Sequence, residues 1–409
     1  MLSLLKIPPL ALYVHFPWCV RKCPYCDFNS HAIKGPLPER RYVELLLRDF
    51  EREAARLRPR PIETIFLGGG TPSLFSPDFV DVLLSGVRRL AAVPDGAEVT
   101  LEANPGTIER GRFAEYRAAG VNRVSLGAQS FNSLHLRALG RIHSADETRR
   151  AVDELKSAGI ENFNLDLMYG LPEQTVAQSI ADLEAGLALD PTHLSHYQLT
   201  LEPGTAFFHA SPALPTDEVS WGMQVACQTL LAARGFVQYE VSAYARTRHE
   251  CRHNRNYWDF GDYVGVGAGA HGKLTLADAG RIVRTDRPRG PREYMNWIER
   301  GVPNSDTQIS VAQLPFEFML NALRLKSGFT RASYEARTGL SMDALQEQLG
   351  SAERRELLQC DESGAWRCSD LGYRFLNDLL QIFLFAEPPA IADSYAQDST
   401  MAPAAVRCD

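Results

Sequence analysis

Three cysteines near the start of the chain lie close enough in sequence to share one metal centre. Cys19, Cys23 and Cys26 form a C-x3-C-x2-C array within the segment YVHFPWCVRKCPYCDFNSH. In a chain of this length and in a reducing compartment, such a tight cluster is more often a metal site than part of a disulfide framework. The other five cysteines are scattered, and we interpret most of them as small buried or incidental thiols.

Three thiolates are too few for a closed structural zinc site, which normally has four protein ligands. A zinc ion would need His15 or His31 as its fourth ligand. Iron–sulfur clusters are held by cysteine thiolates. A cubane [4Fe–4S] cluster on three cysteines keeps one iron open to a substrate or cofactor, so the array predicts this cluster, with zinc as the alternative.

Composition excludes several other classes of protein. The 409 residues are 45% hydrophobic and 23% charged, as in soluble globular proteins, and they suffice for two domains. A net charge of −7 argues against general affinity for nucleic acid or an anionic membrane surface. We find neither a signal peptide nor the ~20 apolar residues that a transmembrane segment needs. We therefore expect a cytoplasmic protein.

Strands and helices alternate through residues 1–245. Short apolar runs predict strands, and the longer amphipathic segments between them predict helices. Gly120, Gly159 and Gly235 each stand where a helix can end in the left-handed conformation. This alternation implies parallel strands in an α/β fold, specifically a partial, open (βα)6 TIM-like barrel. The six predicted strands are 12–16, 64–67, 99–103, 123–126, 163–168 and 194–199.

Polar groups occur where these predicted strands end. The cysteine array follows the first strand, and GGGTPS (68–73) follows the second. Glu102, Gln129 and Asp166 are carried by the next three strands. Since such barrels place their active sites at the C-terminal ends of the strands, we expect these residues to converge on one site. Separate pairing of each with the backbone is the alternative.

The chain changes character after residue 245. Residues 246–310 contain CRHNRNYWDFGDYVGVGAGAHG and a basic run, and we assign them to a connecting segment. Residues 311–386 are predicted to be a mostly helical, winged-helix-like domain that ends in a hairpin and a helix. Acidic residues slightly outnumber basic ones there, which argues against DNA binding. Residues 387–409 have the composition of a disordered tail.

The cysteine array, with Tyr25 before its last cysteine, resembles the radical S-adenosylmethionine (SAM) superfamily. The motifs YVHFPWC, GGGTPS, LEANP, GAQSF and LDLMYGLP resemble, in order, the branch that contains oxygen-independent coproporphyrinogen III oxidase. The resemblance implies that SAM chelates the open iron of the cluster. For Arg141 the alternative is a solvated helix residue. The implied SAM-contacting residues are Tyr13, Tyr25, Gly69, Gly70, Thr71, Glu102, Gln129, Arg141 and Asp166.

Three features favour the heme chaperones of this branch, the HemW family, over the oxidase. Asp27-Phe28 follows the third cysteine, as in HemW proteins, whereas the oxidase has a glycine and a fourth cysteine there. The oxidase also has a longer N-terminal arm. The segment HNRNYW (253–258) resembles the HemW motif that is associated with heme binding. The resemblance implies a chaperone that passes heme to heme-requiring enzymes, some of them at the membrane; the oxidase, or another radical SAM tetrapyrrole enzyme, is the alternative.

The residue that would ligate heme iron is left open by the sequence. His253 is a candidate because a neutral imidazole ligates heme iron, and Tyr257 and Trp258 could pack on the porphyrin. Cys251 and His271 compete with it, and His253 could instead be a structural residue. Arg281, Arg284, Arg287 and Arg289 could meet heme propionates or form a solvated loop. The sequence also leaves open whether the protein is a homodimer.

Overall fold

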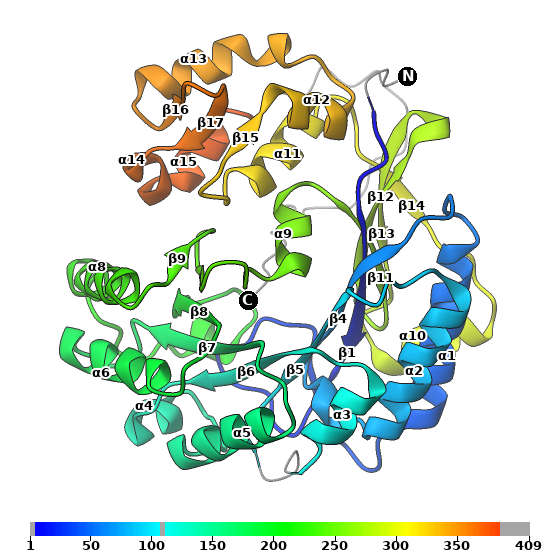
Figure 1. Ribbon diagram of the computed structural model, residues 1–409, viewed down its shortest axis with the longest axis vertical. Helices are drawn as coiled ribbons and strands as arrows, with labels where there is room; N and C mark the ends of the chain where they lie inside the picture. The colour runs from blue at the N-terminus through cyan, green and yellow to red at the C-terminus, as the bar shows by residue number, and fades with distance from the viewer. Residues whose placement is uncertain (1–4, 107–110, 385–409) are drawn as a thin grey trace.

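Six parallel strands form the centre of the molecule, and they follow one another in chain order (Figure 1). The computed structural model describes residues 5–106 and 111–384, so the predicted tail lies outside the described residues. All six predicted strands are confirmed, and their bounds differ from the prediction by a few residues at most. They are β1 (Leu10–Phe16), β4 (Ile62–Gly69), β5 (Glu98–Ala103), β6 (Arg123–Gln129), β7 (Phe163–Tyr169) and β8 (His193–Gln198).

The sheet is open, as predicted, but it continues beyond both ends of the parallel part. At one end β11 (Asp262–Val266) pairs in parallel with β1, and β12 (His271–Leu276), β13 (Arg281–Asp286) and β14 (Asp306–Gln308) follow in antiparallel order. At the other end, β10 (Ala243–Ala245) and β9 (Val237–Gln238) follow β8. The described strands run from β14 to β9 without closing into a barrel.

Residues 246–310 are therefore more than the predicted connecting segment, because β11 to β14 belong to the main sheet. Glycines in this segment interrupt the apolar pattern by which strands are recognised in a sequence. A Cβ atom at Gly265 in β11 would lie only 1.9 Å from the carbonyl oxygen of His271, so glycine permits the close approach of β11 and β12. The basic run is likewise strand β13 and the turn that follows it.

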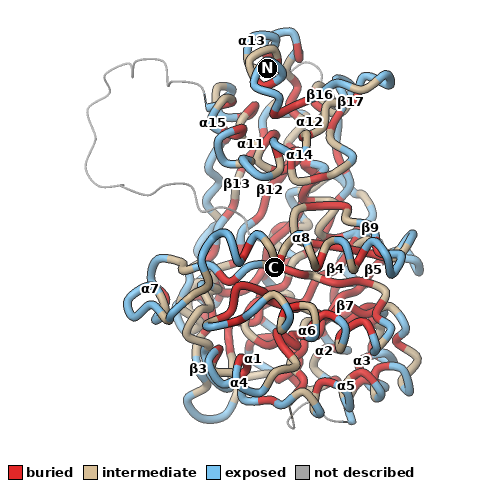
Figure 2. Tube along the Cα trace, turned by 90° about the vertical axis from the view of Figure 1, so that its left-hand side faces the viewer, coloured by how far each residue is buried: buried red, intermediate tan, exposed pale blue. Residues whose placement is uncertain are grey.

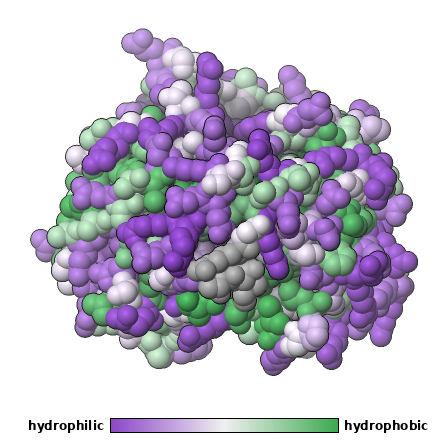
Figure 3. Space-filling model, turned by 60° about the horizontal axis from the view of Figure 1, so that its bottom comes forward, coloured by the Kyte–Doolittle hydropathy of each residue, from purple (hydrophilic) through white to green (hydrophobic). Residues whose placement is uncertain are grey.

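Helices cover the outer face of the parallel sheet, and Figure 1 shows them around its convex side. Gly120, Gly159 and Gly235 end helices at φ values of 110°, 73° and 78°, which confirms the predicted joints. The outward sides of the helices are polar, and the face at the bottom of Figure 1 is mostly hydrophilic (Figure 3). The main covering helices are α1 (Glu39–Ala54), α2 (Pro77–Leu90), α3 (Phe113–Ala119), α5 (Ala145–Ser157), α6 (Val176–Leu187), α8 (Asp217–Ala233) and α10 (Pro291–Glu299).

The two faces of the parallel strands differ in chemistry. Leu101 and Leu165 belong to the apolar core under the helices, which appears as buried tube in Figure 2. Along each strand, the side chains that alternate with these apolar residues lie on the inner face of the sheet. There, polar side chains form hydrogen bonds from one strand to the next. For example, Asn164 donates to Ser125 at 2.8 Å, and Ser125 donates to Asp166 at 3.2 Å. The inner face is thus prepared for polar ligands.

The C-terminal part has its own apolar core, centred on residues such as Phe318, Leu345 and Leu358. It contains helices around a three-stranded antiparallel sheet, which agrees with the predicted mostly helical, winged-helix-like domain. The predicted hairpin is β16–β17. The elements of this C-terminal domain are α11 (Leu314–Ala322), β15 (Phe329–Thr330), α12 (Arg331–Thr338), α13 (Gln346–Arg354), β16 (Leu358–Cys360), β17 (Ala365–Cys368), α14 (Asp370–Arg374) and α15 (Leu376–Gln381).

A buried group of charges fixes the start of β11 beside β1. The Asp262 carboxylate is 0% exposed and accepts from Lys273 at 3.0 Å, Arg60 at 2.6 Å and the Thr275 hydroxyl at 2.8 Å. Burial opposes ionisation of Asp262, but Lys273 and Arg60 outweigh it and hold the pKa of the carboxyl below its usual value. Asp262 is therefore an anion that the surrounding cations require.

Replacing this anion tests whether the buried ion pair anchors β11. We expect Asp262→Asn to lower the free energy of unfolding by about 3–5 kcal/mol, because Lys273 is left buried without its counter-ion. The measurement is urea denaturation followed by circular dichroism. Asp278→Asn, which breaks an exposed pair with Arg58, is the matched control and should change stability by about 0–1 kcal/mol. Equal losses in the two variants would contradict the anchoring role.

Candidate functional site

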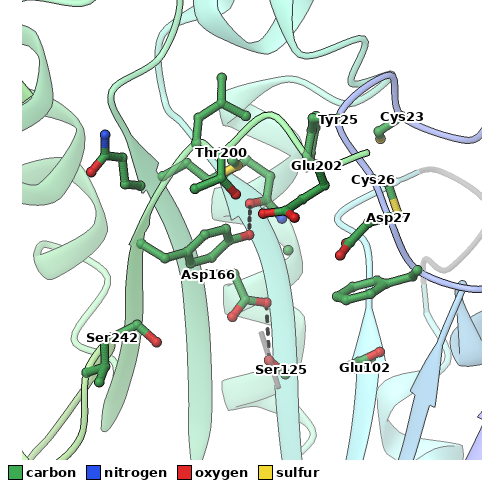
Figure 4. Close-up of a pocket in the computed structure, with 18 of the residues that line it drawn as sticks. Cys23, Tyr25, Cys26, Asp27, Glu102, Ser125, Asp166, Thr200, Glu202 and Ser242 are labelled. Carbon is green, nitrogen blue, oxygen red and sulfur yellow. Dashed lines mark hydrogen bonds between the residues drawn. The ribbon is translucent and has the colours of Figure 1, made fainter. Parts of the chain in front are cut away.

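A cavity of about 570 Å³ lies at the carboxyl ends of the parallel strands (Figure 4). All three cysteines of the array line it. Figure 4 shows Cys23 and Cys26 on one side, Ser242 on the other and Asp166 between them. The predicted SAM residues that line the cavity are Tyr25, Gly69, Gly70, Thr71, Glu102, Gln129, Arg141 and Asp166. The predicted convergence of Glu102, Gln129 and Asp166 is thus present.

Tyr13 is the exception among the predicted SAM residues. Its hydroxyl bonds to Nδ1 of His15 at 2.9 Å, and its ring stacks on Phe66 at a centroid distance of 6.3 Å. Nε2 of His15 bonds to the carbonyl oxygen of Asn29 at 2.9 Å. Both ring nitrogens of His15 are thereby engaged, and burial lowers its pKa to about 4. Tyr13 thus holds the His15 ring, and His15 in turn holds the backbone of the cysteine loop at Asn29.

The cysteine loop is closed by a short parallel pair, β2 (Trp18–Cys19) and β3 (His31–Ala32). Each thiol has a polar neighbour: Thr71 lies 3.5 Å from Cys19, Arg141 lies 3.6 Å from Cys23, and Ser30 lies 3.7 Å from Cys26. Within residues 5–106 and 111–384, no three His, Cys, Asp or Glu side chains gather around the position of a single ion. Three separate thiols around one cavity suit an iron–sulfur cluster, because each thiolate can bind a different iron atom.

The glycine-rich segment passes directly against this loop. Gly69 has φ +115°, and a Cβ atom there would lie 2.6 Å from the His15 ring. A Cβ atom at Gly70 would lie 2.6 Å from the carbonyl oxygen of Trp18. The backbone N–H of Gly69 donates to Glu102 at 2.9 Å. The glycines are therefore needed for the approach of two protein segments as well as for lining the cavity.

Arg141 is not the solvated helix residue of the alternative interpretation. It lies in the loop after α4 (Ser133–Ala138), and its guanidinium donates to the carbonyl oxygen of Gly127 at 2.8 Å and to Asn104. Burial opposes its charge, but the neighbouring Tyr25 and Cys23 raise its pKa above the usual value. Its Nε atom is buried and has no hydrogen-bond partner among the described residues. A buried cation with a spare donor is suited to an anionic ligand.

Asn104 is a wall residue that the sequence did not single out. Its side-chain N–H donates to Thr71 at 3.0 Å while its oxygen accepts from Arg141. It therefore ties the glycine-rich segment to the arginine. Its position in LEANP, two residues after Glu102, was the available signal, because alternate residues continue along one side of a strand. Asp27 and Glu202, which Figure 4 shows beside the cysteine loop, are two further carboxylates on the wall.

Gln129 ends β6 in an unusual conformation. Its φ is +65°, a region that non-glycine residues seldom occupy, and its side chain accepts from Tyr197 at 2.8 Å. Next to it, Asp166 is paired with Ser125 and Asn164. Burial outweighs these hydrogen bonds and raises the pKa of Asp166. Both side chains are held in place before any ligand arrives.

The HNRNYW segment is helix α9 (Arg252–Trp258), and it lies at the opposite end of the strands from the cysteine loop. His253 is 1% exposed; its Nδ1 bonds to the Thr64 hydroxyl at 2.9 Å and its Nε2 to the Tyr257 hydroxyl at 2.8 Å. Burial lowers its pKa to about 3. Thr64 precedes Gly69 of the cavity wall by five residues, or about 16 Å along the strand.

The other candidate ligands of heme iron, Cys251 and His271, differ in their exposure. Cys251 is buried, with its thiol 3.6 Å from Glu98, while His271 is exposed at the start of β12. Tyr257 is buried too, and Trp258 packs under the guanidinium of Arg324, 4.2 Å from the ring centroid. Ligation of heme by His253 stays a prediction, and it requires α9 to leave this position.

Two of the four arginines of the basic run are engaged in ion pairs. Arg287 is buried and bonds to Asp49 and Glu53 of α1, and Arg284 pairs with Glu317 of α11. The solvated-loop interpretation is therefore wrong for these two residues. These ion pairs hold β13 against the helix layer and the C-terminal domain.

No helix among the described residues has the length and hydropathy needed to cross a membrane.

Comparison with known proteins agrees with this geometry. Residues 13–183 match the Radical SAM superfamily, and residues 309–375 match the HemN C-terminal domain. The solved structure of coproporphyrinogen III oxidase (HemN) from Escherichia coli, a radical SAM enzyme, is similar with a TM-score of 0.78, covering 93% of this chain and 91% of that one. At 20% sequence identity, this likeness shows the fold alone.

Closer relatives cover nearly the whole chain. Heme chaperone HemW of Escherichia coli (strain K12) is 47% identical over 384 residues, which are 93% of this chain and 100% of the relative. Heme chaperone HemW of Haemophilus influenzae is 44% identical over 390 residues, again 93% and 100%. The mitochondrial radical S-adenosyl methionine domain-containing protein 1 of Bos taurus is 35% identical, over 90% and 86%. By this identity and coverage, the chain belongs to the HemW family of the radical SAM superfamily.

Proposed function

We propose that this protein is a heme chaperone: it binds heme as cargo and delivers it to heme-requiring enzymes. The observation that carries the proposal is 47% identity, across nearly the whole chain, to a protein named heme chaperone. The cargo and its recipients, some of them at the membrane, are parts of the proposal. So are a cytoplasmic location, the absence of a nucleic-acid partner and a homodimer as an alternative to the monomer.

The cavity supports a resident [4Fe–4S] cluster and SAM. Cys19, Cys23 and Cys26 would hold the cluster, which supplies an open iron to SAM when it is bound. The spare Nε donor of Arg141 suits the SAM carboxylate. Glu102 and Asp166 suit hydroxyl or ammonium groups, which donate to carboxylates. In this proposal the cluster and SAM support heme assembly or transfer.

An enzyme is the second candidate, because the fold matches a solved coproporphyrinogen III oxidase over 93% of the chain. That reading, decarboxylation of coproporphyrinogen III or radical chemistry on another tetrapyrrole, requires 5′-deoxyadenosine to be released only when the tetrapyrrole is present. Anaerobic incubation of the reconstituted protein with SAM and a reductant, with and without the tetrapyrrole, separates the two. The chaperone proposal expects no turnover of coproporphyrinogen III.

The close packing of the glycine segment gives a test of the cluster site. We expect Gly70→Ala to lose most of the iron and sulfide that the wild type takes up in anaerobic reconstitution, because the added Cβ would lie 2.6 Å from the Trp18 carbonyl and push the cysteine loop away. Wild-type protein should hold about four irons per chain. Gly96→Ala is the matched control, since no atom lies within 4 Å of its Cβ position. Full iron content in Gly70→Ala would argue against this geometry.

Heme binding and the role of His253 can be tested together. We expect His253→Ala to lower the free energy of unfolding by about 2–4 kcal/mol, because Thr64 and Tyr257 lose a buried partner and a cavity remains. Heme titration followed at the Soret band is then run under conditions where the variant is folded. A changed Soret position or weaker binding supports ligation by a repositioned His253.

An unchanged Soret spectrum would instead assign His253 to the structural role that its contacts describe, and would move the iron ligand to Cys251 or His271. Thr64→Val is the matched control, because it removes one hydrogen bond of the ring and keeps the imidazole. If the wild type binds no heme, the chaperone proposal fails, whatever the variants do.

A further inference from the structure

The cavity extends well past the residues that the cluster and SAM would use. Its far wall is formed by the C-terminal domain, from α11 and from the α14–α15 pair. Apolar side chains, among them Leu320 and Phe375, alternate there with the polar groups of Asn321 and Tyr373. The C-terminal domain therefore supplies one wall of the cavity, and the radical SAM part of the chain supplies the rest.

Two guanidinium groups lie on this far wall. Arg374 forms no ion pair with any described carboxylate, and its guanidinium stacks 4.4 Å from the ring centroid of Trp221 on α8. Arg324 pairs with Glu240 at 3.1 Å, but its Nε atom is buried and has no hydrogen-bond partner among residues 5–106 and 111–384. Asp378 is the opposing charge on the same wall. The wall thus offers two cationic groups, one unpaired and one with a spare donor.

The supports of Arg324 connect this wall to the HNRNYW segment. Trp258 lies under its guanidinium at 4.2 Å, and the Tyr373 hydroxyl donates to its backbone carbonyl at 2.9 Å. The segment is buried at the other end of the strands, yet one of its side chains positions a group that lines the cavity. HNRNYW can therefore influence a ligand in the cavity without contacting it.

Two partly exposed aromatic side chains adjoin Arg374, and only one of them, Phe375, lines the cavity itself. Phe375 is 51% exposed and Trp221 is 39% exposed. Arg374 directly precedes Phe375 in sequence, and its guanidinium stacks on Trp221. Two exposed aromatic rings beside a cation suit a planar, apolar molecule that carries a carboxylate.

From these contacts we propose that the far wall binds the carboxylate side of a tetrapyrrole, with Arg374 and Arg324 meeting its carboxylates and Phe375 and Trp221 packing at its edge. This inference rests on the proposed function, because it names the seat of the cargo. It places the tetrapyrrole across the cavity from the cysteine loop. Binding in this seat depends on the carboxylates and requires no axial ligand from α9.

Iron-free protoporphyrin IX is the probe, because without iron no residue can act as axial ligand. Full-length reconstituted protein is titrated with this dicarboxylate and with its dimethyl ester, and binding is followed by porphyrin fluorescence. We expect the wild type to prefer the dicarboxylate, and Arg374→Gln to bind it about tenfold more weakly while its affinity for the ester is unchanged. Arg355→Gln, an exposed arginine of the same domain that is off the cavity wall, should match the wild type.

Arg324→Gln is the second variant, with folding checked by circular dichroism because Arg324 packs on Trp258. Equal affinity of the wild type for dicarboxylate and ester, or wild-type affinity in Arg374→Gln, would overturn the inference. Heme binding by a protein that does not bind iron-free porphyrin would overturn it as well and leave the chaperone proposal standing. If the protein binds neither heme nor iron-free protoporphyrin IX, the result contradicts the chaperone proposal itself.

Discussion

Every charge on the inner face of the parallel sheet needs a partner, and the rest of the molecule is arranged around this requirement. Side chains alternate across a strand, so the apolar residues under the outer helices commit the residues between them to the inside. Glu98 and His193 are buried on this inner face, at the amino ends of their strands. Helix α9 meets the first of them, because the backbone N–H groups of Arg252 and His253 donate to Glu98 at 3.1 and 3.0 Å. An unpaired carboxylate in this position would be strongly destabilising.

The two ends of the sheet consequently have different roles. At the amino ends, α9 closes the interior with a neutral histidine, a thiol and two aromatic rings. At the carboxyl ends, the same inner face is left open and is lined by the cysteine loop, the glycine segment and the C-terminal domain. Trp258 and Arg324 join the two ends.

The sequence predicted the central strands well because each is an apolar run bounded by a helix signal. It did so less well where the pattern is broken: β11 and β12 contain glycines that the close strand approach requires, and Gly265 is an example. The converging polar residues were predictable from their places at strand ends. Asn104 was missed because its role depends on Arg141 and Thr71, which lie far away in sequence. The surroundings of His253 were not predictable, since the motif names a residue but not the face of the sheet on which its helix packs.

The position of β1 has a consequence for how the protein is made. One edge of β1 pairs with β4, but its other edge pairs with β11, where Leu10 stands beside Asp262. A ribosome adds about 5–20 residues per second, so that second edge waits on the order of ten to fifty seconds for its partner to be synthesised. An unpaired strand edge is a template for the wrong neighbour. The strand that leads into the cysteine loop is thus secured late, and the nascent chain passes through a stage in which it is exposed to misassembly.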